Sequence, residues 1–252
     1  MTDVVYVIGG GQAGVDDSLP LRWSLRSLAK HASNVGRVII VGVIPKWLTK
    51  EAIVVPTRLT SLGYGSRDKP WNIMYGYVMA VFRLGLDRPF LCSSDDHYFS
   101  APADLDRWPR YFRGELPTKP SGAGWYSRSL VDTRKLLAAH GLSTRRACLH
   151  LNTWADPKDV VSGLAFAERY AQRLPYGAEA TCVFNAFYEK RAGSEGFVDY
   201  PFDSKVFNAA DCQAKVDSGR PQFTTAPSAE RRSDVIDWMA REYPDPSPWE
   251  QS

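Results

Sequence analysis

The sequence predicts an α/β protein whose sheet is mostly parallel and is flanked by helices. Short apolar runs rich in β-branched residues alternate with amphipathic helical stretches over residues 1–100. Each run has the length of a strand buried on both faces, and no apolar stretch approaches the roughly 20 residues of a membrane span. Because strand–helix–strand units return parallel strands through right-handed crossovers, this alternation predicts a layered α/β domain.

The first half of the chain follows the alternation in order. Leucines recur at helical spacing after Pro20, which stands in the first turn of the first helix. The predicted strands are Val4–Ile8, Arg37–Gly42, Ile53–Val55 and Pro89–Cys92. The predicted helices are Leu19–His31 and Lys69–Leu84. We therefore expect residues 1–100 to form a nucleotide-binding half.

The second half is less regular. Residues 101–124 are rich in Pro, Arg and aromatic residues and predict a loop with short elements. Helices are predicted at Ser127–His140, Asp156–Arg173 and Ala229–Tyr243, and a short strand at Ala147–Leu151. The segment Thr181–Tyr188 fits either a helix or a strand. We expect one domain over residues 1–215, then a linker at Pro221–Ala229, the last helix and a mobile tail at Pro244–Ser252.

Composition restricts the class of protein. The chain has 252 residues, 44% hydrophobic and 23% charged, which is ordinary for a globular protein with one substantial core. Its four cysteines form no C-x-x-C pair, which argues against a zinc site and favours reduced thiols and a cytoplasmic location. No basic region precedes the first apolar run, so a signal peptide is not expected. The net charge of +3 is compatible with a polyanionic partner.

The stretch RPFLCSSDDHYFS, Arg88–Ser100, carries the clearest chemical signal. Asp95, Asp96 and His97 follow a predicted buried strand, and open α/β sheets bind ligands at the carboxyl ends of their strands. Two carboxylates and an imidazole can hold a divalent cation that neutralises phosphate oxygens. The alternative is a plain turn capped by Asp95 or Asp96.

Several segments together resemble a known family. They are YVIGG, LRWSLRSLAKH, GRVIIVG, KPWNIM and FLCSSDDHYF. They resemble the GT-A class of nucleotide-sugar glycosyltransferases, and more closely the small glycosyltransferases of bacteriophages and bacterial polysaccharide clusters. The likeness covers residues 3–100, and only fragments match beyond. In that class a D-x-D motif holds Mn²⁺ or Mg²⁺ on the donor diphosphate; here His97 stands at the third position.

The resemblance implies a GT-A-like (Rossmann-like) sheet, an acceptor-side half over residues 101–215, a UDP-sugar donor and Mn²⁺ or Mg²⁺. The metal ligands it implies are Asp95, Asp96, His97 and His150. The implied donor-binding residues are Gly9, Gly10, Gly11, Arg22, Lys69, Asn72 and Asp95. The catalytic candidates are Asp96, Asp132 and Asp203, with Glu179 a further carboxylate. Whether the transfer inverts or retains configuration stays open.

Each of these residues also fits a purely structural role. Gly9–Gly11 fits a plain strand-to-helix turn, and Arg22 fits a solvated helix face. Lys69 and Asn72 fit helix capping as well as nucleotide binding. A lone histidine such as His150 is more often structural, and His97 could brace its own loop.

The acceptor is predicted from the second half. Aromatic residues stack on sugars and on extruded bases, and arginines bind phosphates. The candidates are Trp108, Trp125, Trp154, Arg107, Arg110, Arg113, Arg145 and Arg146. The favoured acceptor is 5-hydroxymethylpyrimidine in double-stranded phage DNA, within the host cytoplasm, and the alternative is a cell-surface polysaccharide.

Two other classes of function remain. A nucleotidyltransferase also uses paired acids, but Gly9–Gly14 contains no basic residue, which counts against it. A non-catalytic nucleic-acid-binding module would leave the acids unexplained, because carboxylates repel phosphate. The oligomeric state is not predicted.

Overall fold

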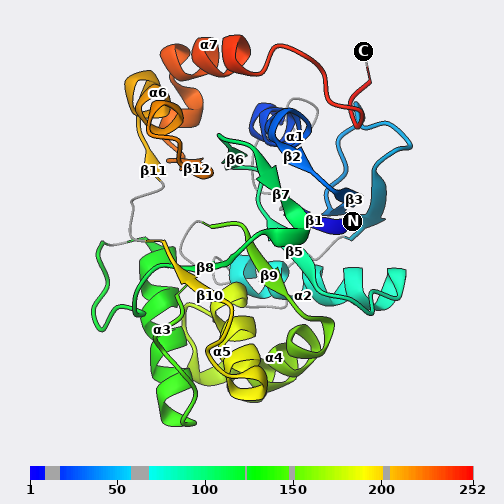
Figure 1. The fold of residues 1–252 in the computed structure, drawn as a ribbon. Coiled ribbons are helices and arrows are strands. Elements are labelled where there is room, and N and C mark those ends of the chain that lie inside the picture. The colour runs from blue at the N-terminus through cyan, green and yellow to red at the C-terminus, as the bar shows by residue number, and fades with distance from the viewer. Residues whose placement is uncertain (9–17, 58–67, 123, 148–150, 201–204, 252) are drawn as a thin grey trace.

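The computed structural model describes residues 1–8, 18–57, 68–122, 124–147, 151–200 and 205–251 (Figure 1). Its central sheet has the order β4-β3-β1-β5-β9, and β9 runs antiparallel to β5 at one edge while the others are parallel. The strands are β1 (Thr2–Ile8), β3 (Val35–Gly42), β4 (Ile53–Pro56), β5 (Phe90–Ser93) and β9 (Thr153–Ala155). In chain order the parallel strands lie 3-2-1-4, as in a Rossmann-like sheet. The predicted α/β class and mostly parallel sheet are confirmed.

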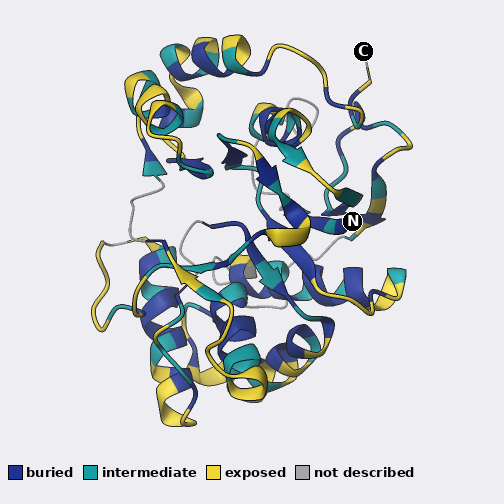
Figure 2. Cartoon of the chain, in the orientation of Figure 1, coloured by how far each residue is buried: buried dark blue, intermediate teal, exposed yellow. Residues whose placement is uncertain are grey.

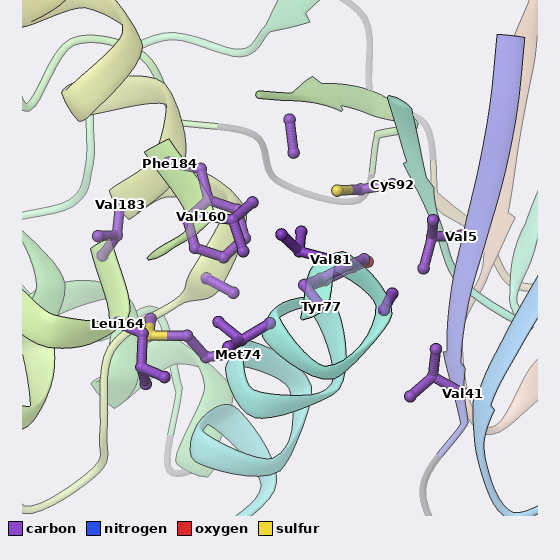
Figure 3. Packing of buried hydrophobic residues seen from close by; sticks show 14 of the residues in the cluster. Val5, Val41, Met74, Tyr77, Val81, Cys92, Val160, Leu164, Val183 and Phe184 are labelled. Atoms are coloured by element: carbon purple, nitrogen blue, oxygen red, sulfur yellow. The ribbon is translucent and has the colours of Figure 1, made fainter. Parts of the chain in front are cut away.

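Helices cover both faces of this sheet because side chains alternate along each strand. Val4 and Tyr6 of β1 face α1 (Leu19–His31), in one apolar cluster. Val5 faces the other side, where Figure 3 shows it with Val41 near residues of α2. The helices of that side are α2 (Asp68–Leu84), α4 (Pro157–Arg169) and α5 (Ala180–Ala192). The first two helices therefore lie on opposite faces and leave the carboxyl ends of β1 and β5 between them.

A second sheet joins distant parts of the chain. It consists of β11 (Lys205–Val206), β12 (Gln222–Thr225) and β6 (His97–Phe99), with β12 antiparallel to β6. Every residue of β12 is buried, and the ring centroids of Phe223 and Tyr98 are 5.2 Å apart. The predicted linker at Pro221–Ala229 is therefore wrong, because its apolar and threonine side chains pair with the strand that follows the acidic motif.

The remaining elements belong to neither of these two sheets. They are α3 (Trp125–Ala139), α6 (Ala209–Asp217), α7 (Ser233–Glu242), the pairs β2 (Ala32–Ser33) with β7 (Ala103–Asp104) and β8 (Arg110–Phe112) with β10 (Phe197–Asp199), and the 3₁₀ turns η3 (Leu105–Arg107), η4 (Ala171–Arg173) and η5 (Ala229–Arg231). The predicted strand Ala147–Leu151 is wrong where the structure describes it, since pairing with β5 places the strand at Thr153–Ala155. The ambiguous segment Thr181–Tyr188 is helical, within α5.

The C-terminal tail is packed, which contradicts the predicted mobility. Glu250 is 5% exposed, and its carboxylate accepts hydrogen bonds from Arg22 and Arg26 of α1. The backbone N–H of Gln251 donates to the carbonyl of Trp47 at 2.7 Å. The tail therefore holds α1 against the segment that follows β3.

Burial follows this architecture. Figure 2 shows buried residues along the central strands and on the inner sides of the helices. Across the described part of the chain, no helix combines the length and the apolar character needed to cross a bilayer.

Candidate active site

The acidic motif lies where the strand order reverses. β1 pairs with β3 on one side and with β5 on the other, and Tyr6 of β1 lies opposite Ser93 of β5. Ser94 and Asp95 therefore follow at the carboxyl end of the sheet, beside the end of β1. In doubly wound sheets the ligand crevice lies at this point, because the following chains turn to opposite faces. Gly9, Gly10 and Gly11, which were predicted to bind the donor here, lie outside the described residues.

Asp95 and Asp96 form a pair of half-buried carboxylates. Ser94 donates its hydroxyl to Asp95 at 3.1 Å, and the backbone N–H of His97 donates to the carbonyl of Ser94 at 3.1 Å, which closes a tight turn. Burial raises the pKa of Asp95, and the negative charge of Asp96 raises it further. Two carboxylates with this mutual repulsion favour a cation between them.

His97 lies between the acidic pair and the interior. Its Nδ1 is 3.2 Å from Oδ1 of Asn152, and its Nε2 is 3.7 Å from Oδ1 of Asp96. Both ring nitrogens therefore face protein groups. This arrangement favours the bracing interpretation of His97 over the metal-ligand one.

Unsatisfied donors lie next to this histidine. Asn152 and Gln222 are 0% and 1% exposed, and the N–H of Asn152 donates to Oε1 of Gln222 at 2.8 Å. The side-chain nitrogens of both amides have no hydrogen-bond partner within the described part of the chain. A buried donor without a partner costs about 1–3 kcal/mol, so these two groups favour the binding of a polar molecule or water beside His97.

Lys69 contributes a positive charge to the surroundings of Asp95, and Trp125 packs against Lys69. Lys69 stands near the start of α2, and its Nζ lies 5.3 Å from the centroid of the Trp125 ring. The positive charge of Lys69 acts to lower the pKa of Asp95, against the effect of burial. The Lys69 ammonium group is therefore within electrostatic range of that carboxylate. The role of Asp95 and Lys69 in donor binding stays a prediction. Asn72 follows one turn later, and its Oδ1 is buried without a partner among the described residues.

Glu230 is a site residue that the sequence did not predict. It lies in η5, and Thr225 donates its hydroxyl to Oε1 of Glu230 at 3.2 Å. Burial raises the pKa of Glu230 to about 7, with further contributions from the charges of Asp96 and Asp95. Three carboxylates from two sequence-distant segments therefore share one electrostatic environment. No local pattern marks Glu230, because its position depends on the pairing of β12 with β6.

Three predicted site residues have structural roles. Asp132 is 7% exposed, its carboxylate accepts the backbone N–H of Tyr176 at 3.0 Å, and burial raises its pKa. Glu179 accepts the N–H of Cys182 at 2.9 Å and caps α5. Arg22 binds Glu250 and lies 4.2 Å over the Trp47 ring. His150 and Asp203 lie outside the described residues.

The basic and aromatic residues predicted to contact the acceptor differ in exposure: Trp108 and Arg110 are buried, whereas Arg107 and Arg145 are exposed. Arg110 is 8% exposed, and its Nη1 donates to the carbonyl of Trp154 and to Oδ1 of Asn185. The indole N–H groups of Trp108 and Trp154 donate to backbone carbonyls. The hollow that these residues line, of about 440 Å³, includes Pro89 at the amino end of β5, opposite the acidic pair. The prediction that Arg110 contacts a phosphate of the acceptor is therefore wrong, because its guanidinium is buried against protein groups.

The donor set suits a cation that is shared with a substrate. Among the described residues, no three His, Cys, Asp or Glu side chains are grouped as a metal site. Mg²⁺ in nucleotide enzymes is often held by one or two carboxylates together with phosphate oxygens of the substrate. The half-buried, mutually repelling carboxylates of Asp95 and Asp96 fit a cation that is held jointly by protein carboxylates and substrate phosphates.

Comparison with known proteins adds no relative. The sequence matches no model of a known protein family, and no curated protein matches it.

Proposed function

We propose that the protein is a glycosyltransferase that moves a sugar from a UDP-sugar to an acceptor hydroxyl. The observation that carries this proposal is the pair of adjacent carboxylates, Asp95 and Asp96, at the carboxyl end of β5 beside the end of β1. These two carboxylates would hold Mn²⁺ or Mg²⁺. The cation would supply charge neutralisation for the diphosphate leaving group.

The surrounding side chains have complementary roles in this proposal. Lys69 offers a positive charge to the diphosphate, and Trp125 offers a ring face on which a sugar or base can stack. His97 holds the loop through Asn152 on one side and Asp96 on the other. The amide nitrogens of Asn152 and Gln222, which have no partner among the described residues, would donate hydrogen bonds to sugar hydroxyls.

We expect UDP to stabilise the protein only when a divalent cation is present. A ligand that binds the folded state alone raises its stability by mass action, about 2.7 kcal/mol at a hundredfold excess over Kd. Without the cation, the carboxylates repel the diphosphate and the increase in Tm largely disappears. Thermal melting with UDP, Mn²⁺, EDTA and NAD measures this. A larger increase with NAD than with UDP and Mn²⁺ would overturn the donor proposal.

The acceptor proposal is hydroxymethylated pyrimidine in double-stranded DNA. The basic net charge of +3 supports it, and the predicted stacking residue Trp125 packs against Lys69, whose charge acts on Asp95. We expect hexose-bearing nucleosides after incubation with UDP-sugars, Mn²⁺ and DNA containing 5-hydroxymethylcytosine, with plain DNA as the control. Digestion and mass analysis provide the measurement. Transfer to an oligosaccharide acceptor, with no modified nucleoside, would favour the polysaccharide alternative.

A further inference from the structure

Glu230 reaches the site through two specific contacts. The backbone N–H of Thr225 donates to the carbonyl of Asp96 at 3.2 Å, and the hydroxyl of the same threonine donates to Oε1 of Glu230 at 3.2 Å. Tyr98 places its hydroxyl 3.4 Å from that of Thr225. The antiparallel register of β12 with β6 therefore fixes the distance between Glu230 and the acidic pair.

The charges around Glu230 come from two other segments. Asp95 and Asp96 follow β5, and Lys69 belongs to α2. Arg231 and Arg232, which follow Glu230 in the sequence, are exposed, and Arg232 forms an ion pair with Asp234 at 2.8 Å. Glu230 is thus half-buried, is held by one neutral hydrogen bond, and makes no ion pair within the described part of the chain.

We infer that Glu230 is the catalytic base that accepts the proton of the acceptor hydroxyl, an inference that rests on the proposed glycosyltransferase function. As the O–H proton passes to the carboxylate, the acceptor oxygen forms a bond to C1 of the sugar. The bond from C1 to the diphosphate oxygen breaks, and its electron pair leaves with UDP. Direct attack from the opposite side inverts the configuration at C1. The products are the glycosylated acceptor, UDP and one proton.

The other described carboxylates considered for the role of base have other partners or other proposed roles. Asp95 and Asp96 are the proposed cation ligands, and Asp132 and Glu179 are engaged by backbone N–H groups. Burial raises the pKa of Glu230 and so makes its carboxylate a stronger base, and the hydrogen bond from Thr225 fixes its position.

The test compares Glu230→Gln with Asp96→Ala and wild type, and uses water as the acceptor. Release of UDP from a panel of UDP-sugars with Mn²⁺ reports the chemical step, and the increase in Tm caused by UDP and Mn²⁺ reports donor binding. Gln keeps the oxygen that accepts the Thr225 hydrogen bond. We expect Glu230→Gln to lose about 10²–10⁴-fold in UDP release and to keep the increase in Tm. Glu195→Gln, at an exposed position, serves as the matched control and should behave as wild type.

The outcomes separate the two proposals. If wild type neither binds UDP with Mn²⁺ nor releases UDP, the proposed function fails. If wild type is active and Glu230→Gln releases UDP at a similar rate, Glu230 is not the base. Loss of the UDP-dependent increase in Tm in Glu230→Gln would make it a donor-site residue and would also overturn the inference, as would a product that retains the donor configuration.

Discussion

Replacement of Asp96 by alanine is expected to abolish sugar transfer and to leave the fold intact. Its carboxylate is one of two that would hold the cation, and loss of electrostatic stabilisation at a leaving group costs on the order of 10³-fold in rate. The backbone carbonyl of Asp96, which accepts the N–H of Thr225, is unaffected by the substitution. Removal of one of two repelling charges should also leave the free energy of unfolding unchanged or slightly higher. Initial rates and thermal melts measure the two effects.

Matched variants make the Asp96 result specific. Asp95→Ala should be nearly as damaging, because its carboxylate is the second proposed ligand. Asp96→Asn keeps the shape and removes the charge, so it should resemble Asp96→Ala in rate. Asp237→Ala, at an exposed position on α7, should be silent. Full activity of Asp96→Ala in the presence of EDTA would end the cation hypothesis.

The elements of the first half could be predicted because their signals are local. The helix Leu19–His31 has the predicted bounds, since Pro20 marks its start and the leucine spacing marks its buried face. The apolar runs that form β1, β3 and β5 are buried on both faces of a sheet, which is why they read as continuous hydrophobic stretches. The same logic placed Asp95 and Asp96 at the carboxyl end of a central strand.

The second half could not be predicted in the same way because its elements depend on long-range contacts. Gln222–Thr225 has the composition of a linker and becomes a buried strand only when β6 lies beside it, more than 100 residues away in sequence. Glu230 enters the site through that pairing. The sequence suggests Arg110 as a phosphate ligand. In the structure its guanidinium is buried instead: it donates to the carbonyl of Trp154, and its central carbon lies 3.8 Å from the centroid of the Tyr188 ring.

The largest effect on stability is expected from the C-terminal tail, through Glu250. Its side chain is 0% exposed, and Arg26 donates to both of its oxygens while Arg22 donates to Oε2. Removal of one partner from a buried ion pair costs about 3–5 kcal/mol. The side chains of Arg22 and Arg26 are 21% and 18% exposed, so water offsets part of this cost and we expect about 2–3 kcal/mol for Glu250→Gln. Chemical denaturation gives the value directly.

The pH dependence of the effect of Glu250→Gln, together with a control variant, tests whether the ion pair accounts for the loss of stability. Burial alone would raise the pKa of Glu250, but the hydrogen bonds and charge of Arg26 and the N–H of Ser247 lower it below the ordinary value of 4.5. A carboxyl whose pKa is lower in the folded state stabilises the protein fully above its unfolded pKa and loses that contribution as the pH falls through the folded pKa. The difference in the free energy of unfolding between wild type and Glu250→Gln should therefore be constant near neutral pH and shrink below about pH 4.5.

The control variant Glu242→Gln removes a more exposed ion pair with Lys30 and should cost less than about 1 kcal/mol. Equal losses in the two variants would show that the tail does not anchor α1.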